Sequence, residues 1–306
     1  MKQTELKNLS LLLLTAMIWG AAFVAQSAGM DHVGPFTFLC TRSILGGLFL
    51  LPCIPLFDRL QGRHPSDQIT GDRGSRPTLL FAGLCAGAVL MIASSFQQIG
   101  IQYTSVGKAG FLTAMYVIIV PFLGLALFRR RLEKRIWLCV FLSVFGMALL
   151  CLSGSLRLEL GDGLELLCAL AFSVHILVLD HFTNRVDPVR LSCIQFFACA
   201  ALAAVPMLIL EHPTMQVILD AWMPIAYAGI LSSGVGYTLQ AVAQRKCDPT
   251  LASLVMCLES VFSVIFGWIL LHEVLTPREI FGCVLMFIAI VLANLPAKQT
   301  EPAASV

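Results

Sequence analysis

The sequence predicts an all-α integral membrane protein with ten transmembrane helices. Hydrophobic residues make up 58% of the 306 residues and charged residues only 12%, whereas a soluble protein usually carries about 25% charged residues. The apolar residues form continuous runs, each close to the roughly 20 residues that a helix needs to cross a bilayer core. A membrane β-barrel would instead need short segments of alternating polarity.

Ten such runs follow one another along the chain. The first, after Lys2 and Lys7, is too long for a signal peptide. Proline at a first helical turn and a capping residue before it mark several starts, at Pro35, Asp187-Pro188, Asp248-Pro249 and Thr276-Pro277. The expected spans are 9–29, 34–57, 78–99, 104–128, 135–153, 162–183, 188–210, 220–243, 249–271 and 277–296. The longest polar connection is 58–77.

Lys and Arg predict the orientation, because cytoplasmic loops are enriched in them. Alternate connections hold sixteen of these residues, and the opposite connections hold only Arg157 and Arg278. Both termini are therefore expected in the cytoplasm, with the protein in the inner or plasma membrane. Arg42 and Lys108 are the two basic residues that fall inside spans.

The two halves of the chain resemble each other. The matched positions are Trp19-Gly20 with Phe172-Ser173, Pro35 with Pro188, Arg42 with Gln195, Gln97 with Gln240, Ala109 with Ala252, Tyr116 with Glu259 and Leu132 with Leu275. Each half holds five spans, so the second half must enter the membrane from the opposite side. The expected organisation is an inverted repeat, 1–153 and 154–296, with a tail at 297–306, and such repeats place a binding site at their interface.

Other chemistry is not indicated. The eleven cysteines lie mostly inside apolar runs and form no C-x-x-C pair, which favours packing over a metal site or a disulfide framework. The sequence has no Walker A loop and no H-E-x-x-H motif. We expect no metal, no cofactor, no nucleic-acid partner and no enzymatic activity.

Particular motifs resemble the EamA type of the drug/metabolite transporter superfamily. They are Ile18-Trp19-Gly20-Ala21-Ala22-Phe23, Arg42, Leu231-Ser232-Ser233, Tyr237, Leu239-Gln240, Ala243-Gln244, Leu258-Glu259-Ser260-Val261-Phe262 and Gly267-Trp268. The chain departs from the family pattern at two places. Ser260 stands where the family commonly has proline, and His272-Glu273 stands where the family usually has Gly-Glu. The resemblance implies a ten-helix carrier that moves, and often exports, small organic solutes.

Polar residues inside the spans are the candidates for a transport site, because an ionisable group at membrane depth is costly. Glu259 is the first candidate; it could exchange a proton near neutral pH or fix helix packing. Arg42 could bind a solute carboxylate or extend to the outer headgroups. His175 could relay a proton or hydrogen-bond a neighbour.

Further candidates are weaker individually. Gln97 and Gln240 occupy matched repeat positions and could line gates or join helices. Trp19, Phe23, Tyr116 and Tyr237 could wall an amphipathic pocket or belong to the core.

The inverted repeat and the polar residues inside the spans favour a carrier with a cavity between the repeats that works by alternating access. The resemblance implies that it is a secondary active transporter exporting an amino-acid-like metabolite or drug. Its expected partners are a small-molecule solute and membrane lipids, with a proton as a candidate coupling ion. The alternatives are an intramembrane enzyme acting on a lipid or prenyl substrate, and a membrane sensor that does not transport. Monomer and homodimer both stay open.

Overall fold

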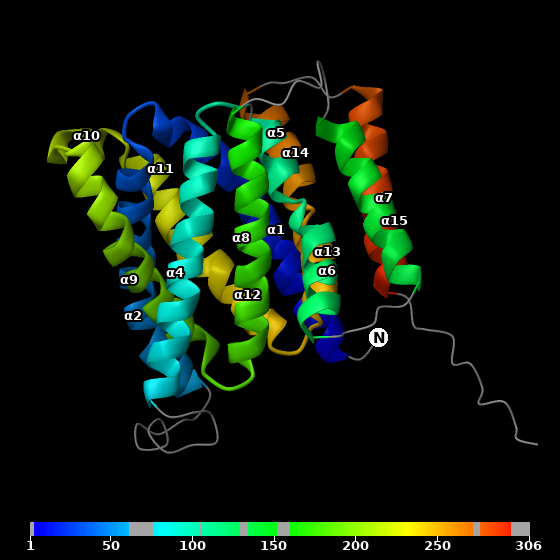
Figure 1. Ribbon diagram of the computed structural model, residues 1–306, viewed down its shortest axis with the longest axis horizontal. Helices are drawn as coiled ribbons and strands as arrows, with labels where there is room; N and C mark the ends of the chain where they lie inside the picture. Colours follow the sequence, from blue (N-terminus) through cyan, green and yellow to red (C-terminus); the bar gives the residue numbers. More distant parts are fainter. Residues whose placement is uncertain are drawn as a thin grey trace, which may run out of the picture.

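Long apolar runs bounded by proline and capping residues give an all-α structure (Figure 1). This computed structural model describes residues 3–60, 76–104, 106–128, 134–151, 160–271 and 276–294, and those residues contain no β-strand. Seven helices among them are long and apolar enough to cross a membrane. The prediction of an all-α membrane protein is confirmed. The tail at 297–306 and most of the loop at 58–77 lie outside the described residues.

The helices of the first half stand beside those of the second (Figure 1). The first half comprises α1 (Gln3–Met30), α2 (Pro35–Leu60), α4 (Arg76–Gly100), α5 (Val106–Thr113), α6 (Tyr116–Phe128) and α7 (Lys134–Cys151). The second half comprises α8 (Leu160–Thr183), α9 (Pro188–Pro206), η1 (Met207–Glu211), α10 (Met215–Asp220), α11 (Trp222–Ala226), η2 (Tyr227–Tyr237), α12 (Thr238–Gln244), α13 (Pro249–Met256), α14 (Glu259–Leu271) and α15 (Pro277–Asn294).

Capping residues act where the sequence places them. The Asp187 side chain accepts hydrogen bonds from the backbone N–H groups of Val189 and Arg190, at 3.1 Å each. Asp248 accepts one from the N–H of Thr250 at 2.9 Å. These bonds satisfy N–H groups that the first helical turn leaves unpaired, so α9 and α13 begin at the predicted residues.

Four of the predicted spans are not single α-helices. The span at 188–210 passes from α9 into the π-helical segment η1. The span at 104–128 is interrupted by a turn at Ala114–Met115, and the span at 249–271 by a turn at Cys257–Leu258. The span at 220–243 contains η2, a π-helical segment that includes three glycines. Continuous hydrophobicity does not reveal such breaks, because turn and helix are equally apolar here.

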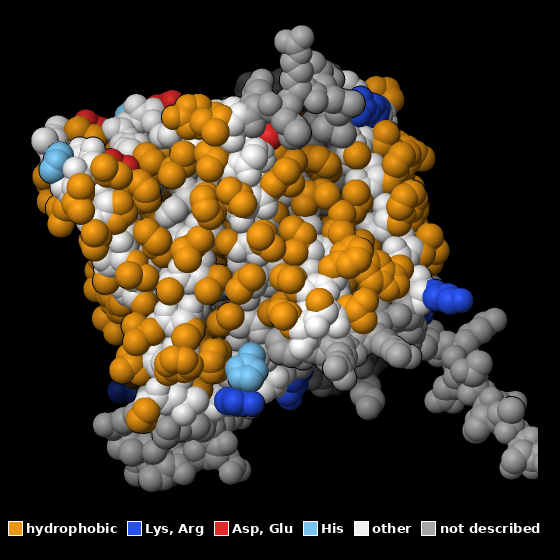
Figure 2. All heavy atoms as spheres, viewed as in Figure 1, with side chains coloured by type: hydrophobic (Ala, Val, Ile, Leu, Met, Phe, Trp, Pro, Cys, Tyr) orange, Lys and Arg blue, Asp and Glu red, His pale blue; other side chains and the backbone are white. Residues whose placement is uncertain are grey.

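Hydrophobic side chains cover the face in Figure 2 between the two ends of the bundle, and charged side chains gather toward those ends. Large apolar groups on α6, α7 and α15 are more than half exposed, including Leu127, Phe141 and Val291. Their exposure matches a surface in contact with lipid chains, where apolar side chains lose nothing by facing outward.

The antiparallel pair α2–α9 joins the two halves at both ends. At one end, Arg190 forms an ion pair with Asp58. At the other end, Glu211 accepts hydrogen bonds from the N–H groups of Phe36 (2.9 Å) and Thr37 (2.7 Å) and from the Thr37 hydroxyl (2.6 Å). A carboxylate is well placed here, because the first turn of α2 presents unpaired N–H groups and positive dipole charge.

Glycine permits the close approach of α1 to α14. A Cβ added to Gly20 would lie 2.4 Å from Cβ of Phe262 and 2.8 Å from its carbonyl carbon. Both distances are too short for packed atoms, and one contact is to backbone, so a substitution must push the helices apart.

We expect Gly20→Ala to destabilise the protein by about 1–3 kcal/mol, the usual cost of overpacking. The measurement is thermal unfolding of the full chain in detergent micelles. Gly124→Ala on α6 is the matched control, because its added Cβ meets no atom within 4 Å. Equal unfolding temperatures for the two variants would contradict this account of the α1–α14 contact.

Candidate functional site

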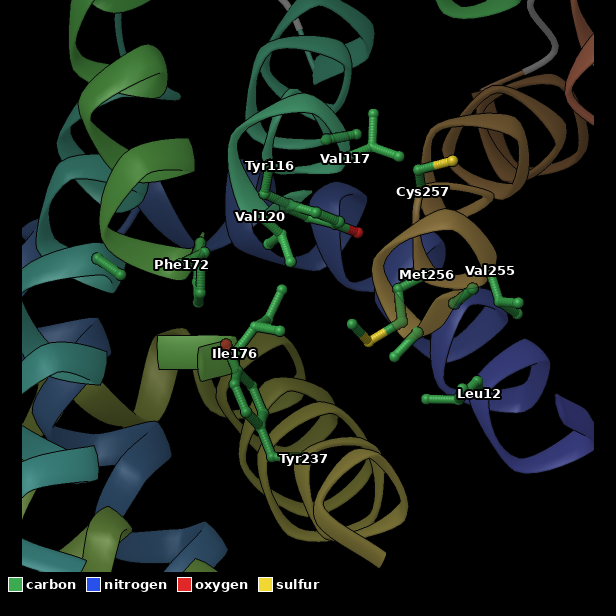
Figure 3. Packing of buried hydrophobic residues seen from close by; sticks show 14 of the residues in the cluster. Leu12, Tyr116, Val117, Val120, Phe172, Ile176, Tyr237, Val255, Met256 and Cys257 are labelled. Carbon is green, nitrogen blue, oxygen red and sulfur yellow. The ribbon is translucent and has the colours of Figure 1, made fainter. Parts of the chain in front are cut away.

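A cavity lies among the helices of both halves, and polar and aromatic side chains share its wall. Tyr116 of α6, Phe172 and Ile176 of α8, Tyr237 of η2 and Met256 of α13 approach it (Figure 3). The space open to water-sized spheres is about 30 Å³, enough for about two water molecules. A solute of several heavy atoms therefore needs a wider cavity than this one.

The structure places eight of the nine candidate residues in the cavity wall. These are Trp19, Phe23, Arg42, Gln97, Tyr116, Tyr237, Gln240 and Glu259. They come from α1, α2, α4, α6, η2, α12 and α14, so segments far apart in the sequence build the wall together.

Glu259 meets Tyr116 across the interface of the halves. The Tyr116 hydroxyl donates to Oε1 of Glu259 at 2.9 Å, and Glu259 is only 3% exposed. Tyr116 is the first residue of α6 and Glu259 the first of α14, so each directly follows a helix break. The positive end of the α14 dipole favours a carboxylate at this position.

Ser260 has its own role beside Glu259. Its hydroxyl donates to the backbone oxygen of Gly110 at 3.0 Å, which ties α14 to α5. Its N–H donates to the carbonyl oxygen of Cys257 at 3.2 Å. Proline, which lacks an N–H, could make neither bond, so the departure from the family pattern adds two contacts at the break.

Arg42 is a buried cation in the cavity wall. It is 4% exposed, its Nη1 donates to Oε1 of Gln26 at 3.0 Å, and its guanidinium lies 5.9 Å from the Phe38 ring centre. Within the described part of the chain, no carboxylate lies within ion-pair distance of it. This placement inside the protein differs from a side chain extended to the headgroups.

Trp19 and Tyr237 form one aromatic side of the cavity, with ring centres 4.7 Å apart. The Trp19 indole N–H donates to the carbonyl oxygen of Ser232 at 3.3 Å. A Cβ on Gly236 would lie 2.7 Å from that indole nitrogen, so glycine in η2 makes room for the ring.

His175 lies behind the wall. Its Nε2 is 3.1 Å from Oε1 of Gln195, and its ring makes edge contacts with Tyr237 and Phe172 at centre distances of 5.9 and 6.4 Å. It therefore supports two residues of the cavity without lining it.

The matched glutamines both reach the cavity, but their contacts differ. Nε2 of Gln97 lies 3.5 Å from the Thr113 hydroxyl. Oε1 of Gln240 is buried and has no hydrogen-bond partner.

Several cavity or near-cavity residues were not among the sequence candidates, including the polar groups Gln26, Thr113 and Glu165. Thr113 lines the cavity and donates from its hydroxyl to Oε2 of Glu165 at 2.8 Å. Of these, Glu165 could have been identified from the sequence, because it is a carboxylate a few residues into the span predicted at 162–183. Gln26 and Thr113 are uncharged, and a single uncharged polar residue inside an apolar run gives no comparable indication.

The chain was compared with known proteins. The model of the EamA-like transporter family matches residues 6–152 and again residues 159–295. An uncharacterized transporter of Archaeoglobus fulgidus is 27% identical over 284 residues, which cover 93% of this chain and 84% of that protein. An uncharacterized transporter of Synechocystis is 24% identical over 310 residues, covering 95% and 91%. A solved structure, titled only as a crystal structure of a protein, has a TM-score of 0.74 at 16% identity over 94% of this chain and 96% of that chain, which shows likeness of fold.

Removal of the Tyr116 hydroxyl should destabilise the cavity. We expect Tyr116→Phe to lower the free energy of unfolding by about 0.6–1.7 kcal/mol, the range for hydrogen bonds between membrane helices. Denaturant unfolding in mixed micelles measures the change, and Tyr103→Phe is the control because Tyr103 is half exposed. If the two variants lose the same stability, the bond to Glu259 does not hold the helices together.

Proposed function

This chain belongs to the EamA-like transporter family, and on that premise we propose that it is a secondary active carrier exporting a small organic solute across an inner or plasma membrane. The observation that carries the proposal is the cavity shared by both halves, in which Tyr116 and Glu259, at matched repeat positions, hydrogen-bond to each other. A group on each half thus contributes to one site.

We propose ten transmembrane helices arranged as two inverted repeats, 1–153 and 154–296. The family model matches each half once, which supports the repeat. The two helix breaks also occur at matched positions, because Ala114–Met115 and Cys257–Leu258 differ by the same 143 residues that relate Tyr116 to Glu259. The antiparallel course of α2 and α9, which are counterparts in the repeat, supports inversion.

The proposed solute is an amino-acid-like metabolite or a drug of similar character. Arg42 offers a buried cation without a carboxylate partner in the described residues, and Glu259 offers a carboxyl group in the same cavity. Phe23, Phe172 and Met256 supply apolar surface. A solute with an anionic group, a hydrogen-bonding or cationic group and an apolar part would satisfy all three.

Transport requires the cavity to change shape. At about 30 Å³ it is too small for such a solute, so binding must widen it toward one side of the membrane. Rocking of one half against the other about the shared cavity supplies that change and gives alternating access.

The test is flux in proteoliposomes that contain the full chain and a panel of amino acids and other small metabolites. We expect Glu259→Gln to reduce the rate of the transported solute at least about tenfold, equivalent to roughly 1.4 kcal/mol in a barrier. Asp220→Asn is the matched acid-to-amide control, since Asp220 is exposed.

Two results together would reject the carrier. No solute in the panel would show flux, and the Glu259→Gln variant would be stabilised by added solutes to the same extent as the wild type. Solute binding without flux would instead identify a sensor, and chemical turnover of an added lipid would identify an enzyme.

The proposed orientation makes a separate prediction. Gln102 and Asn184 are exposed at opposite ends of the bundle. In a variant whose native cysteines are replaced, Gln102→Cys should react with a membrane-impermeant maleimide in intact cells, and Asn184→Cys should react only after permeabilisation. The reverse pattern would overturn a cytoplasmic location for both termini.

A further inference from the structure

Glu165 is a buried carboxyl group that lies between the cavity and one end of the bundle. It is fully buried, and it follows the exposed Leu160 at the start of α8 by five residues, about 7.5 Å along a helix. In the proposed orientation that end faces outward. Glu165 thus lies little more than one helical turn from the outer end of α8.

The hydrogen bonds of Glu165 are incomplete. Oε2 accepts the Thr113 hydroxyl at 2.8 Å, whereas Oε1 is buried and has no partner. No Lys, Arg or His of the described ranges forms an ion pair with it. An ionised carboxylate in that setting would cost several kcal/mol, so this arrangement holds the group as a neutral acid.

Thr113 connects Glu165 to the cavity. Its hydroxyl lines the cavity while it donates to Glu165, and it lies 3.5 Å from Nε2 of Gln97, another cavity residue. A change in the cavity that moves Thr113 therefore removes the hydrogen bond that Oε2 of Glu165 accepts from it.

The repeat gives Glu165 and Thr113 apolar counterparts. The offsets that match Trp19 with Phe172 and Tyr116 with Glu259 place Leu12 at the position of Glu165 and Met256 at the position of Thr113. Leu12 and Met256 are both fully buried in the main hydrophobic core, on α1 and α13, which pack together (Figure 3). At the counterpart positions apolar residues are sufficient for packing. The polar pair of Glu165 and Thr113 therefore has a role other than packing.

We propose that Glu165 is a proton-binding site of this carrier, loaded from the outer side and linked to the solute cavity through Thr113. The proposal rests on the proposed function. When the outer side opens, the Glu165 carboxylate takes a proton from outer water and becomes the neutral acid that the closed structure holds. When the cavity then opens to the inner side, the acid releases that proton to inner water, so each cycle carries one proton inward and leaves the carboxylate as it began.

Other groups act on Glu165 from the helices around it. Asp162 and Cys168 are the titratable neighbours on α8, and Glu259 is the titratable neighbour on α14. Gly100 of α4 faces it without a side chain, with a notional Cβ only 2.8 Å from Oε1. The neighbouring carboxyl groups disfavour a further negative charge at Glu165.

Infrared difference spectroscopy tests proton binding directly. Full-length protein in phosphatidylcholine–phosphatidylglycerol vesicles is perfused at a series of pH values, and the carbonyl stretch of protonated carboxyl groups is followed. We expect Glu165→Gln to remove one pH-dependent component that Glu259→Gln leaves in place. Thr113→Val should extend the Glu165 component to higher pH, because it removes the donor that stabilises the ionised form.

Two results would overturn the proposal: a Glu165→Gln spectrum identical to that of the wild type, or a component that Thr113→Val does not move. A purely structural Glu165 predicts both. If Glu165→Gln does not fold, the Thr113→Val shift decides alone.

A transport measurement separates this proposal from the proposed function. For a solute that the wild type moves, Glu165→Gln should retain solute exchange when the pH is equal on both sides. The factor by which a pH gradient accelerates transport should fall at least tenfold in this variant. Acceleration by a Na⁺ gradient in place of a pH gradient would reject the proton as the ion. If the wild type moves no solute, the proposed function fails, and the infrared result still decides whether Glu165 binds a proton.

Discussion

The hydrogen bond between Tyr116 and Glu259 is the interaction on which the arrangement of the cavity depends. A carboxyl group at membrane depth needs partners within the protein, because lipid offers none. Here the partner comes from the other half of the chain, and each residue begins a helix just after a break. The bond therefore fixes two interrupted helices relative to each other and sets where Trp19, Arg42 and Tyr237 must stand to complete the wall.

The same requirement explains why the interior is more polar than the lipid-facing surface. Leu127 and Phe141 face outward at no cost, whereas Arg42 and Glu165 are enclosed. Small residues let backbones approach closely enough to surround those polar groups; Gly20 against Phe262 is one example. In this chain packing and polarity are linked, since each buried polar group depends on close helix contacts to exclude lipid.

The sequence was sufficient to predict the membrane class, because long apolar runs and proline starts act locally. It also predicted most of the cavity wall: a residue such as Arg42 inside an apolar run has to find a place within the protein. It could not predict the breaks before Tyr116 and Glu259 or the π-helix η2, since these depend on tertiary contacts between equally apolar segments. Glu165 was not predicted as a site residue, because a carboxylate near the end of a span is equally consistent with the membrane surface. His175 lies one layer behind the wall, and this placement depends on tertiary packing.

The two ends of the molecule differ in the chemistry that closes them, and this difference has a consequence for a carrier. Both ends hold a polar contact between α2 and the α9 segment, Glu211 with the start of α2 at one end and Asp58 with Arg190 at the other, so the difference lies between the cavity and each end. Toward the end near Glu165 the contact is polar, Thr113 with Glu165. Toward the opposite end the repeat counterparts of this pair, Leu12 and Met256, are apolar. Opening the polar end exposes groups that can bind protons, whereas opening the apolar end exposes hydrocarbon, which water disfavours at any pH. Two halves related by a repeat but unlike between the cavity and each end would respond to different signals, and that inequality would allow a cycle to couple ion entry to solute exit.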